Sequence, residues 1–234
     1  LPPTAALSPK KARCKEVPEG PKTLELAHVE RLLTFAQQSA AAEIGFGHLS
    51  SAGTIDNQFA PSTLITARMT FSFTIASKLG FSEYTSLAER GVKALSTVFH
   101  DDDHGGFFSV APGFGDAGNK SAYDHAFVLL AASTAQSHGI IGADALTNAA
   151  LDTLFSRFWR EDIGIFANSF NRDFSEEEPY LGANANMHAV EALIAASEAT
   201  GNRSLLERAL QISHFMVNTH ARSREWMMPE HFHP

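Results

Sequence analysis

A helical pattern that recurs three times is the feature that most constrains the fold of this chain. Three segments rich in Ala, Ser and Phe end in a shared serine and predict helices over Ala67–Leu79, Tyr123–Ser133 and Gly182–Ser197. A second, more polar helix is expected after each of them, over Tyr84–Phe99, Asp144–Phe158 and Ser204–His220. Helices that are apolar almost all round are buried, and amphipathic helices cover them. The pattern therefore predicts an inner ring of helices inside an outer ring.

Related segments extend this repeat in both directions. An amphipathic helix is expected over Thr23–Ala42, and a fourth repeat is expected to begin at Trp226–Phe232. Three full hairpins make about half of a closed six-hairpin toroid, and an open solenoid is the alternative. In either case the predicted class is all-α, built from helical-hairpin repeats. Residues 1–22 are expected to form an irregular N-terminal arm, and residues 23–234 a single helical domain.

The loops between the repeats share a glycine next to an aromatic residue. The opening helix runs into Gly45-Phe46, and the next two outer helices run into Gly105-Gly106-Phe107 and Gly164-Ile165-Phe166. The first of these lacks a third glycine and a preceding strand, so it is not a dinucleotide-binding loop. No cofactor is predicted from any of them.

Composition narrows the function classes. The chain has 234 residues, of which 44% are hydrophobic and 19% charged, as is ordinary for a soluble globular protein. The net charge of -8 and the lack of a dense Lys and Arg run argue against binding to nucleic acid or to an anionic membrane. A single cysteine, Cys14, cannot form an internal disulfide, which suits a cytoplasmic protein. The longest apolar run, Ala126–Ala132, is too short to span a membrane.

One predicted inner helix, Gly182–Ser197, carries a polar stripe. Asn184, His188 and Glu191 are spaced by four and three residues, which places them on one face of the helix. The other side of this helix is apolar, so the helix can be buried. Buried polar groups need partners, and either a hydrogen-bond network or a ligand must supply them here.

The closing serines of the three inner helices align their polar residues. This alignment places Arg68, Asp124 and His188 at the same distance before the serine, with Tyr123 and His125 beside Asp124. The N-terminal ends of the inner helices are then expected to meet at one mouth of the ring. Such ends favour electron-rich oxygens and keep a nearby histidine neutral. The alternative is that these residues cap helices and tie the two rings together.

Two groups of histidines could suggest a metal site. The sequence His100–His104 (HDDDH) contains imidazole and carboxylate ligands, but it falls in a turn, and a solvated acidic turn is favoured. His231 and His233 lack any framework of further ligands. No metal is therefore predicted. The phenylalanines of the inner helices are expected to be core residues rather than a ligand platform: Phe71, Phe73 and Phe127.

Four segments together resemble a known family. These are TARMTFSFTIAS, KSAYDHAFVLLAAS, NANMHAVEALIAAS and MMPEHF, and the likeness runs from about Leu24 to Phe232. They resemble the N-acylglucosamine 2-epimerase superfamily, and within it the bacterial mannose and sulfoquinovose isomerase branch. The resemblance implies an (α/α)6 barrel that binds a sugar in its central cavity. It also implies isomerisation or epimerisation by movement of the C2 proton, without a metal or a nicotinamide.

The family's motifs assign roles to matching residues. They place His188 beside the reacting end of the sugar as the catalytic residue. The residues expected to bind the substrate are Arg68, Tyr123, Asn184 and Met187 by motif, with Glu191 from the same polar stripe. Leu64 stands where the family usually has a tryptophan, which removes a stacking surface. The family's two principal acid–base histidines belong to motifs that would follow Pro234, so the chain is expected to be the N-terminal half of the barrel, inactive alone if complete.

The sequence therefore predicts a sugar isomerase that interconverts an aldose, mannose-like or sulfonated, and its ketose through an enediol. Asn184 and Arg68 would hold O1 and O2 as charge develops on them. Three alternatives remain open: a hexose or N-acylhexosamine 2-epimerase, a glycoside hydrolase using Asp124 and Glu191, and a non-catalytic sugar-binding half-barrel. The expected partner is a monosaccharide, and a homo-oligomer is a further possibility.

Overall fold

The computed structural model describes residues 22–115 and 118–232, and the expected arm up to residue 21, Cys14 and His233 lie outside them. The described part is mainly helical, as predicted. Its α-helices are α1 (Lys22–Ala36), α2 (Thr63–Lys78), α3 (Thr85–Thr97), α4 (Ala122–Ser137), α5 (Ala143–Thr153), α6 (Ala183–Thr200) and α7 (Ser204–His214). Each predicted helix is present. Three of them reach their expected ends only through non-α segments: the 3-10 helix Gln37–Ala41 continues α1, and π-helical segments continue α5 over Leu154–Phe158 and α7 over Phe215–Ala221. Short 3-10 helices cover Gln37–Ala41, Ser82–Tyr84 and Arg222–Arg224.

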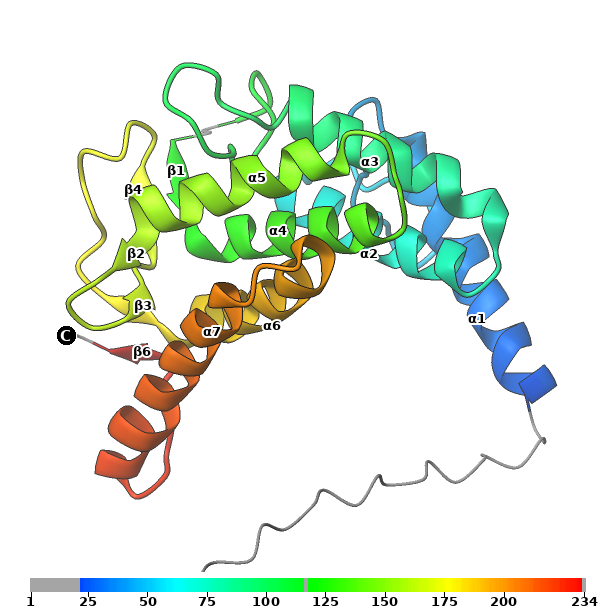
Figure 1. Ribbon diagram of the computed structural model, residues 1–234. Helices are drawn as coiled ribbons and strands as arrows, with labels where there is room; N and C mark the ends of the chain where they lie inside the picture. The colour runs from blue at the N-terminus through cyan, green and yellow to red at the C-terminus, as the bar shows by residue number, and fades with distance from the viewer. Residues whose placement is uncertain (1–21, 116–117, 233–234) are drawn as a thin grey trace, which may run out of the picture.

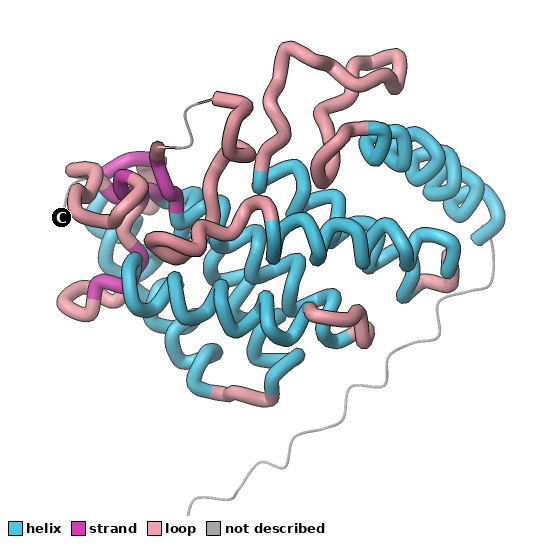
Figure 2. Tube along the Cα trace, turned by 90° about the horizontal axis from the view of Figure 1, so that it is seen from above, coloured by secondary structure: helices cyan, strands magenta, loops and turns pink. Residues whose placement is uncertain are grey.

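The helices form two layers along an arc. The inner helices α2, α4 and α6 pack side by side in that order, and α3, α5 and α7 each pack on the inner helix that precedes them. Helices α1 and α7 lie at opposite ends of the arc (Figure 1), and Figure 2 shows the same helices from above. Gly91 allows α3 to approach α2, because a Cβ atom there would lie 1.8 Å from Oγ1 of Thr70. The predicted inner and outer layers are confirmed.

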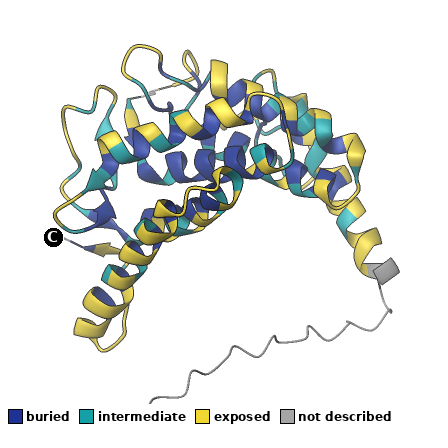
Figure 3. Ribbon diagram, in the orientation of Figure 1, coloured by how far each residue is buried: buried dark blue, intermediate teal, exposed yellow. Residues whose placement is uncertain are grey.

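Helix α4 is the centre of the core. Its sequence is mostly apolar, and every residue from Asp124 to Ala135 is buried. It is flanked by α2 and α6 and covered by α5, whereas α1 and the end of the α7 hairpin are largely exposed (Figure 3). Because more of its residues are buried than in α2 or α6, close packing fixes the side chains of α4 more firmly than those of the helices beside it.

The same backbone junction recurs at the start of each inner helix. Strand β1 (Asn119–Ser121) pairs with β4 (Ser169–Asn171), β5 (Leu181–Gly182) pairs with β6 (His231–Phe232), and an isolated bridge joins Ser62 to Val110. The first residue of each inner helix donates its N–H across this junction, from Thr63 to Ser109, from Ala122 to Asn168 and from Ala183 to Glu230. These bonds make Thr63, Ala122 and Ala183 equivalent positions of the repeat.

This register corrects the alignment on closing serines. Counted from the helix starts, Arg68, Phe127 and His188 are equivalent, whereas Asp124 lies one turn earlier in α4, level with Ile65. The serine alignment is wrong for α4 because a helix rich in Ala and Ser repeats its pattern at every turn. The hydrogen bonds of the junction show which residues of the three inner helices are equivalent, whereas the pattern of small residues does not.

Each Gly-aromatic loop is held by one side chain of the next inner helix. The N–H of Phe46 donates to Oγ1 of Thr66 (3.3 Å), that of Phe107 to Nε2 of His125 (3.0 Å) and that of Phe166 to Oδ1 of Asn186 (2.8 Å). Thr66, His125 and Asn186 occupy the fourth position of α2, α4 and α6, and we call them the loop-anchoring row. The alternative interpretation of the sequence, in which polar residues tie the layers together, is confirmed for His125. A short hairpin of β2 (Trp159–Arg160) and β3 (Ile165–Phe166) closes one of these loops.

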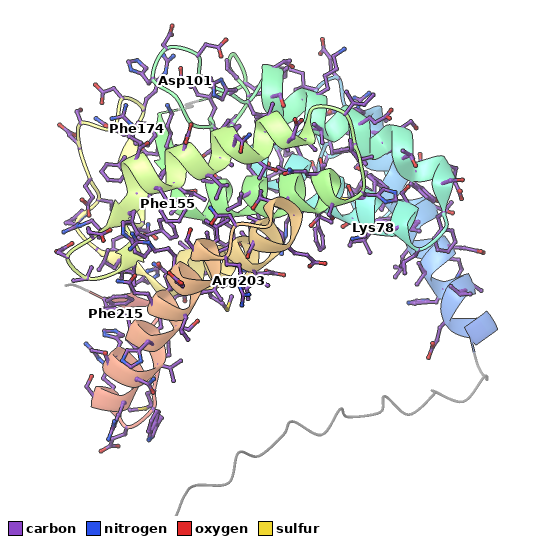
Figure 4. The ribbon with its side chains drawn as sticks, in the orientation of Figure 1. Lys78, Asp101, Phe155, Phe174, Arg203 and Phe215 are labelled. Atoms are coloured by element: carbon purple, nitrogen blue, oxygen red, sulfur yellow. The ribbon has the colours of Figure 1, made fainter. Side chains whose placement is uncertain are left out.

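The predicted solvated turn at His100–His104 is only partly correct. Asp102 and Asp103 are exposed, but Asp101 is buried, with Nζ of Lys120 and Nε of Arg172 each 2.9 Å from its Oδ2 atom. Burial raises the pKa of Asp101, but the hydrogen bonds from Arg172 and Lys120 outweigh it and hold that pKa well below its ordinary value. Figure 4 shows Asp101 among the loops, on the same side as Phe174, whose ring lies 4.7 Å from Nζ of Lys120. Asp101 is therefore a buried ion-pair anchor within an otherwise exposed acidic turn.

Candidate active site

The inner helices present a second row of equivalent residues on the face that the outer helices leave uncovered. This concave row consists of Arg68 on α2, Phe127 on α4 and His188 on α6, each at the sixth position of its helix. The guanidinium carbon of Arg68 lies 4.9 Å from the centre of the Phe127 ring. The centre of the His188 imidazole lies 4.6 Å from the centre of the same ring. Residues that the sequence places far apart thus form one continuous contact.

Tyr123 completes this cluster from one turn earlier on α4. Its ring lies 5.3 Å from the imidazole of His188, edge to face, and 5.0 Å from the ring of Phe127. Edge-to-face packing is the favoured geometry of aromatic pairs and fixes the orientation of both rings. The imidazole of His188 is therefore held by two aromatic side chains of the most buried helix.

Glu191 sets the hydrogen bonding of His188. Its Oε2 atom lies 3.2 Å from Nδ1 of His188, one helical turn away. When Nδ1 donates to this carboxylate, the neutral imidazole keeps a lone pair on Nε2. The His188 side chain is 20% exposed, so it is both packed and accessible. This arrangement suits a group that accepts a proton from a ligand.

Asn184 and Met187 lie beside this cluster, on the side of α6 that faces Met216 and Met228. Both are exposed, and both line a groove of about 550 Å3. The groove is mainly apolar, and its other walls include Val190, Met216 and Met228. The predicted site residues therefore fall into two adjoining groups, with Arg68, Tyr123, His188 and Glu191 in the cluster and Asn184 and Met187 in the groove.

The two polar residues next to Tyr123 point away from this face. The Asp124 carboxylate accepts a hydrogen bond from Oγ of Ser109 (2.6 Å), and burial raises its pKa. His125 is fully buried, and burial lowers its pKa to about 4. Neither side chain belongs to the concave row, so the geometry does not support a pair of catalytic carboxylates formed by Asp124 and Glu191.

Phe127 is the residue of this cluster that the sequence pattern assigned to the core alone. It is indeed buried, with 6% of its surface exposed, yet its ring touches both Arg68 and His188. Aligning the three inner helices on their first residues identifies it, because Phe127 is then the counterpart of Arg68 and His188 in the middle repeat.

Metal-ligand clusters and membrane-spanning helices are both absent from the described residues. Within residues 22–115 and 118–232, no three His, Cys, Asp or Glu side chains converge in a way that could hold a metal ion. Over the same residues, no helix has the length and apolar character needed to cross a membrane.

Comparison with known proteins agrees with this architecture. Residues 45–234 match the family model described as N-acylglucosamine 2-epimerase (GlcNAc 2-epimerase). The chain therefore belongs to the N-acylglucosamine 2-epimerase family, as its motifs indicated.

The similar proteins include sugar isomerases. The chain is 40% identical over 210 residues to the D-mannose isomerase of Thermobifida fusca, an alignment that covers 89% of this chain and 52% of that protein. It is 41% identical over 203 residues to the D-mannose isomerase of Pseudomonas cannabina pv. alisalensis, covering 87% of this chain and 49% of that protein. A crystal structure of D-mannose isomerase superposes with a TM-score of 0.83 at 26% identity, over 94% of this chain and 59% of that chain.

These matches define the fold as part of an (α/α)6 barrel, which confirms the predicted class. The chain spans about half of the length of the curated relatives that it matches.

Proposed function

We propose that this protein is an aldose–ketose isomerase that acts on mannose or a similar hexose, sulfonated hexoses included, with His188 as a proton-transfer group. The observation that carries the proposal is the His188–Glu191 pair, held on the uncovered face beside Arg68. The relatives that are named D-mannose isomerases support the choice of sugar.

The proposed reaction moves one proton from C2 to C1 and, between the oxygens, one from O2 to O1. Nε2 of His188 takes the proton from C2 of the open-chain aldose, and the electrons of that bond form a C1–C2 double bond as the carbonyl oxygen O1 is protonated. The O2 proton is then released, O2 becomes the carbonyl oxygen, and C1 receives a proton to give the ketose. Charge that develops on O1 and O2 is stabilised by the Arg68 guanidinium and the Asn184 amide. Glu191 keeps Nδ1 of His188 protonated throughout.

A 2-epimerase is the second candidate, and the description of the family favours it. It shares the first half of the mechanism, and the proton returns to the opposite face of C2 instead of C1. The same side chains serve both reactions, so the product distinguishes them and the residues do not.

The experiment is incubation of the protein with D-mannose in D2O, followed by chromatography and NMR of the products. Isomerisation gives fructose with deuterium at C1. The C2 epimer, glucose with deuterium at C2, would instead establish the epimerase. Recovery of mannose alone, without solvent deuterium, would contradict both reactions.

A further inference from the structure

We infer that Phe127 is a positioning residue, whose ring packs against the His188 imidazole and biases the Arg68 guanidinium toward a position beside it. The inference rests on the proposed function for its catalytic meaning, but the positioning itself is a property of the fold. It concerns three side chains at the same level of three neighbouring helices.

The Phe127 ring lies between the two polar side chains and contacts both of them. Arg68 belongs to α2 and His188 to α6, and α4 lies between these helices. The Phe127 ring approaches the guanidinium at 4.9 Å and the imidazole at 4.6 Å. The position of this ring therefore influences the spacing of both groups.

The ring is itself well fixed. Phe127 belongs to α4, in which every residue from Asp124 to Ala135 is buried, and the centre of the Tyr123 ring lies 5.0 Å from the centre of its own ring. A phenylalanine has only two side-chain torsions, so close packing leaves it little freedom.

Arg68, in contrast, depends on this ring. It is exposed, and within the described residues its guanidinium makes no ion pair. The rotamer entropy of a free arginine side chain outweighs the free energy of a single cation–π contact at an exposed site. The contact biases the guanidinium toward one position without locking it, and removal of the aromatic face releases it.

The test compares Phe127→Met with Phe73→Leu in the full chain. Phe127→Met keeps most of the volume and removes the aromatic face. Phe73 is also buried, in α2, but packs on Phe46 and Tyr84, away from the concave row. Phe127→Leu is the second variant, for use if the methionine variant fails to fold.

The first readout is the heteronuclear NOE of the Arg68 Nε–Hε group, assigned by its loss in Arg68→Lys. We expect a higher NOE in wild type and in Phe73→Leu than in both Phe127 variants, because the variants lose the contact that biases the guanidinium. An Arg68 NOE in the Phe127 variants as high as in wild type would overturn the inference, as would an equal fall in the Phe73→Leu control.

The second readout is sugar turnover. We expect the Phe127 variants to raise KM and to lower kcat, with kcat/KM falling about tenfold, and Phe73→Leu to stay within about twofold of wild type. Unchanged turnover in a Phe127 variant would remove the catalytic meaning of the contact. If wild type itself converts no mannose, the proposed function fails, and the NOE still decides whether Phe127 positions Arg68.

Discussion

The loop-anchoring row and the concave row use the same three helices for different purposes. Asn186 and His188 illustrate this, because they are two residues apart on α6. An α-helix turns about 100° per residue, so two residues apart means a rotation of about 200° and nearly opposite faces. Asn186 is buried against a loop, whereas His188 lies on the uncovered face.

The two rows also differ in how fully their polar atoms are used. The Asn186 side chain makes three hydrogen bonds, to both backbone groups of Phe166 and to the carbonyl of Gly182. In the concave row, Arg68 contacts a ring and His188 has one carboxylate partner. Polar groups with spare capacity at an accessible surface are the ones that can bind a ligand. The type of residue alone therefore does not separate structural from functional positions. The face of the helix from which its side chain projects does.

The largest effect on stability is expected from Asn186→Ala. Both backbone groups of Phe166 would lose their partner while remaining buried, at a cost of about 3 kcal/mol in the free energy of unfolding. Urea denaturation measures this cost. His188→Ala is the matched control and should lose less than about 1 kcal/mol. Equal losses for the two variants would break the distinction between the rows.

A pH-dependent effect is expected from His125, the one member of the loop-anchoring row that titrates. Burial lowers its pKa from 6.5 to about 4, outweighing the hydrogen bond to the carbonyl of Ser121. Between these pH values the unfolded chain binds the proton and the folded chain does not. The contribution of the neutral His125 to the free energy of unfolding is therefore complete above pH 6.5. It is lost as the pH falls toward 4, by about 3 kcal/mol at most.

The measurement compares wild type with His125→Asn, which copies the residue used in the next repeat. Unfolding free energies between about pH 4 and 6.5 should fall less steeply in the variant. Asp101 and Asp124 also titrate with shifted pKa values, but they are present in both proteins and cancel in the difference. Parallel curves would show that His125 is not buried in its neutral form.

The smallest effect is expected from Thr66→Val. The hydrogen bond from the N–H of Phe46 to Thr66 is the longest in the loop-anchoring row, at 3.3 Å. Its loss should cost about 1 kcal/mol, with no change in volume to add to it. Thermal or urea unfolding measures the loss, and a cost larger than that of Asn186→Ala would reverse the expected ranking of the row.

Much of the fold could be predicted from the sequence, because apolar periodicity and the recurring loops mark the helices and their layers. The register of α4 could not, since its small residues match at every turn. The burial of Asp101 could not either, because its partners Lys120 and Arg172 follow it at a distance in the chain and no local pattern connects them.

The candidate site was predictable in part. The spacing of Asn184, His188 and Glu191 places them on one helical face, and the family motifs add Arg68 and Tyr123. Phe127 was missed because a phenylalanine in an apolar helix is ordinarily a core residue. Only the packing of α2 and α6 on either side of α4 shows that its ring also meets the polar side chains.

His188 is the residue on which the proposed catalysis depends most directly, and the decisive measurement is the rate of mannose-to-fructose conversion by His188→Ala relative to wild type. His214→Ala, which alters an exposed histidine at the end of α7, is the control. We predict that kcat/KM falls by about 100-fold or more in His188→Ala, while the control and the free energy of unfolding remain near wild type. Conversion at the wild-type rate by folded His188→Ala would contradict the assignment of the concave row to catalysis.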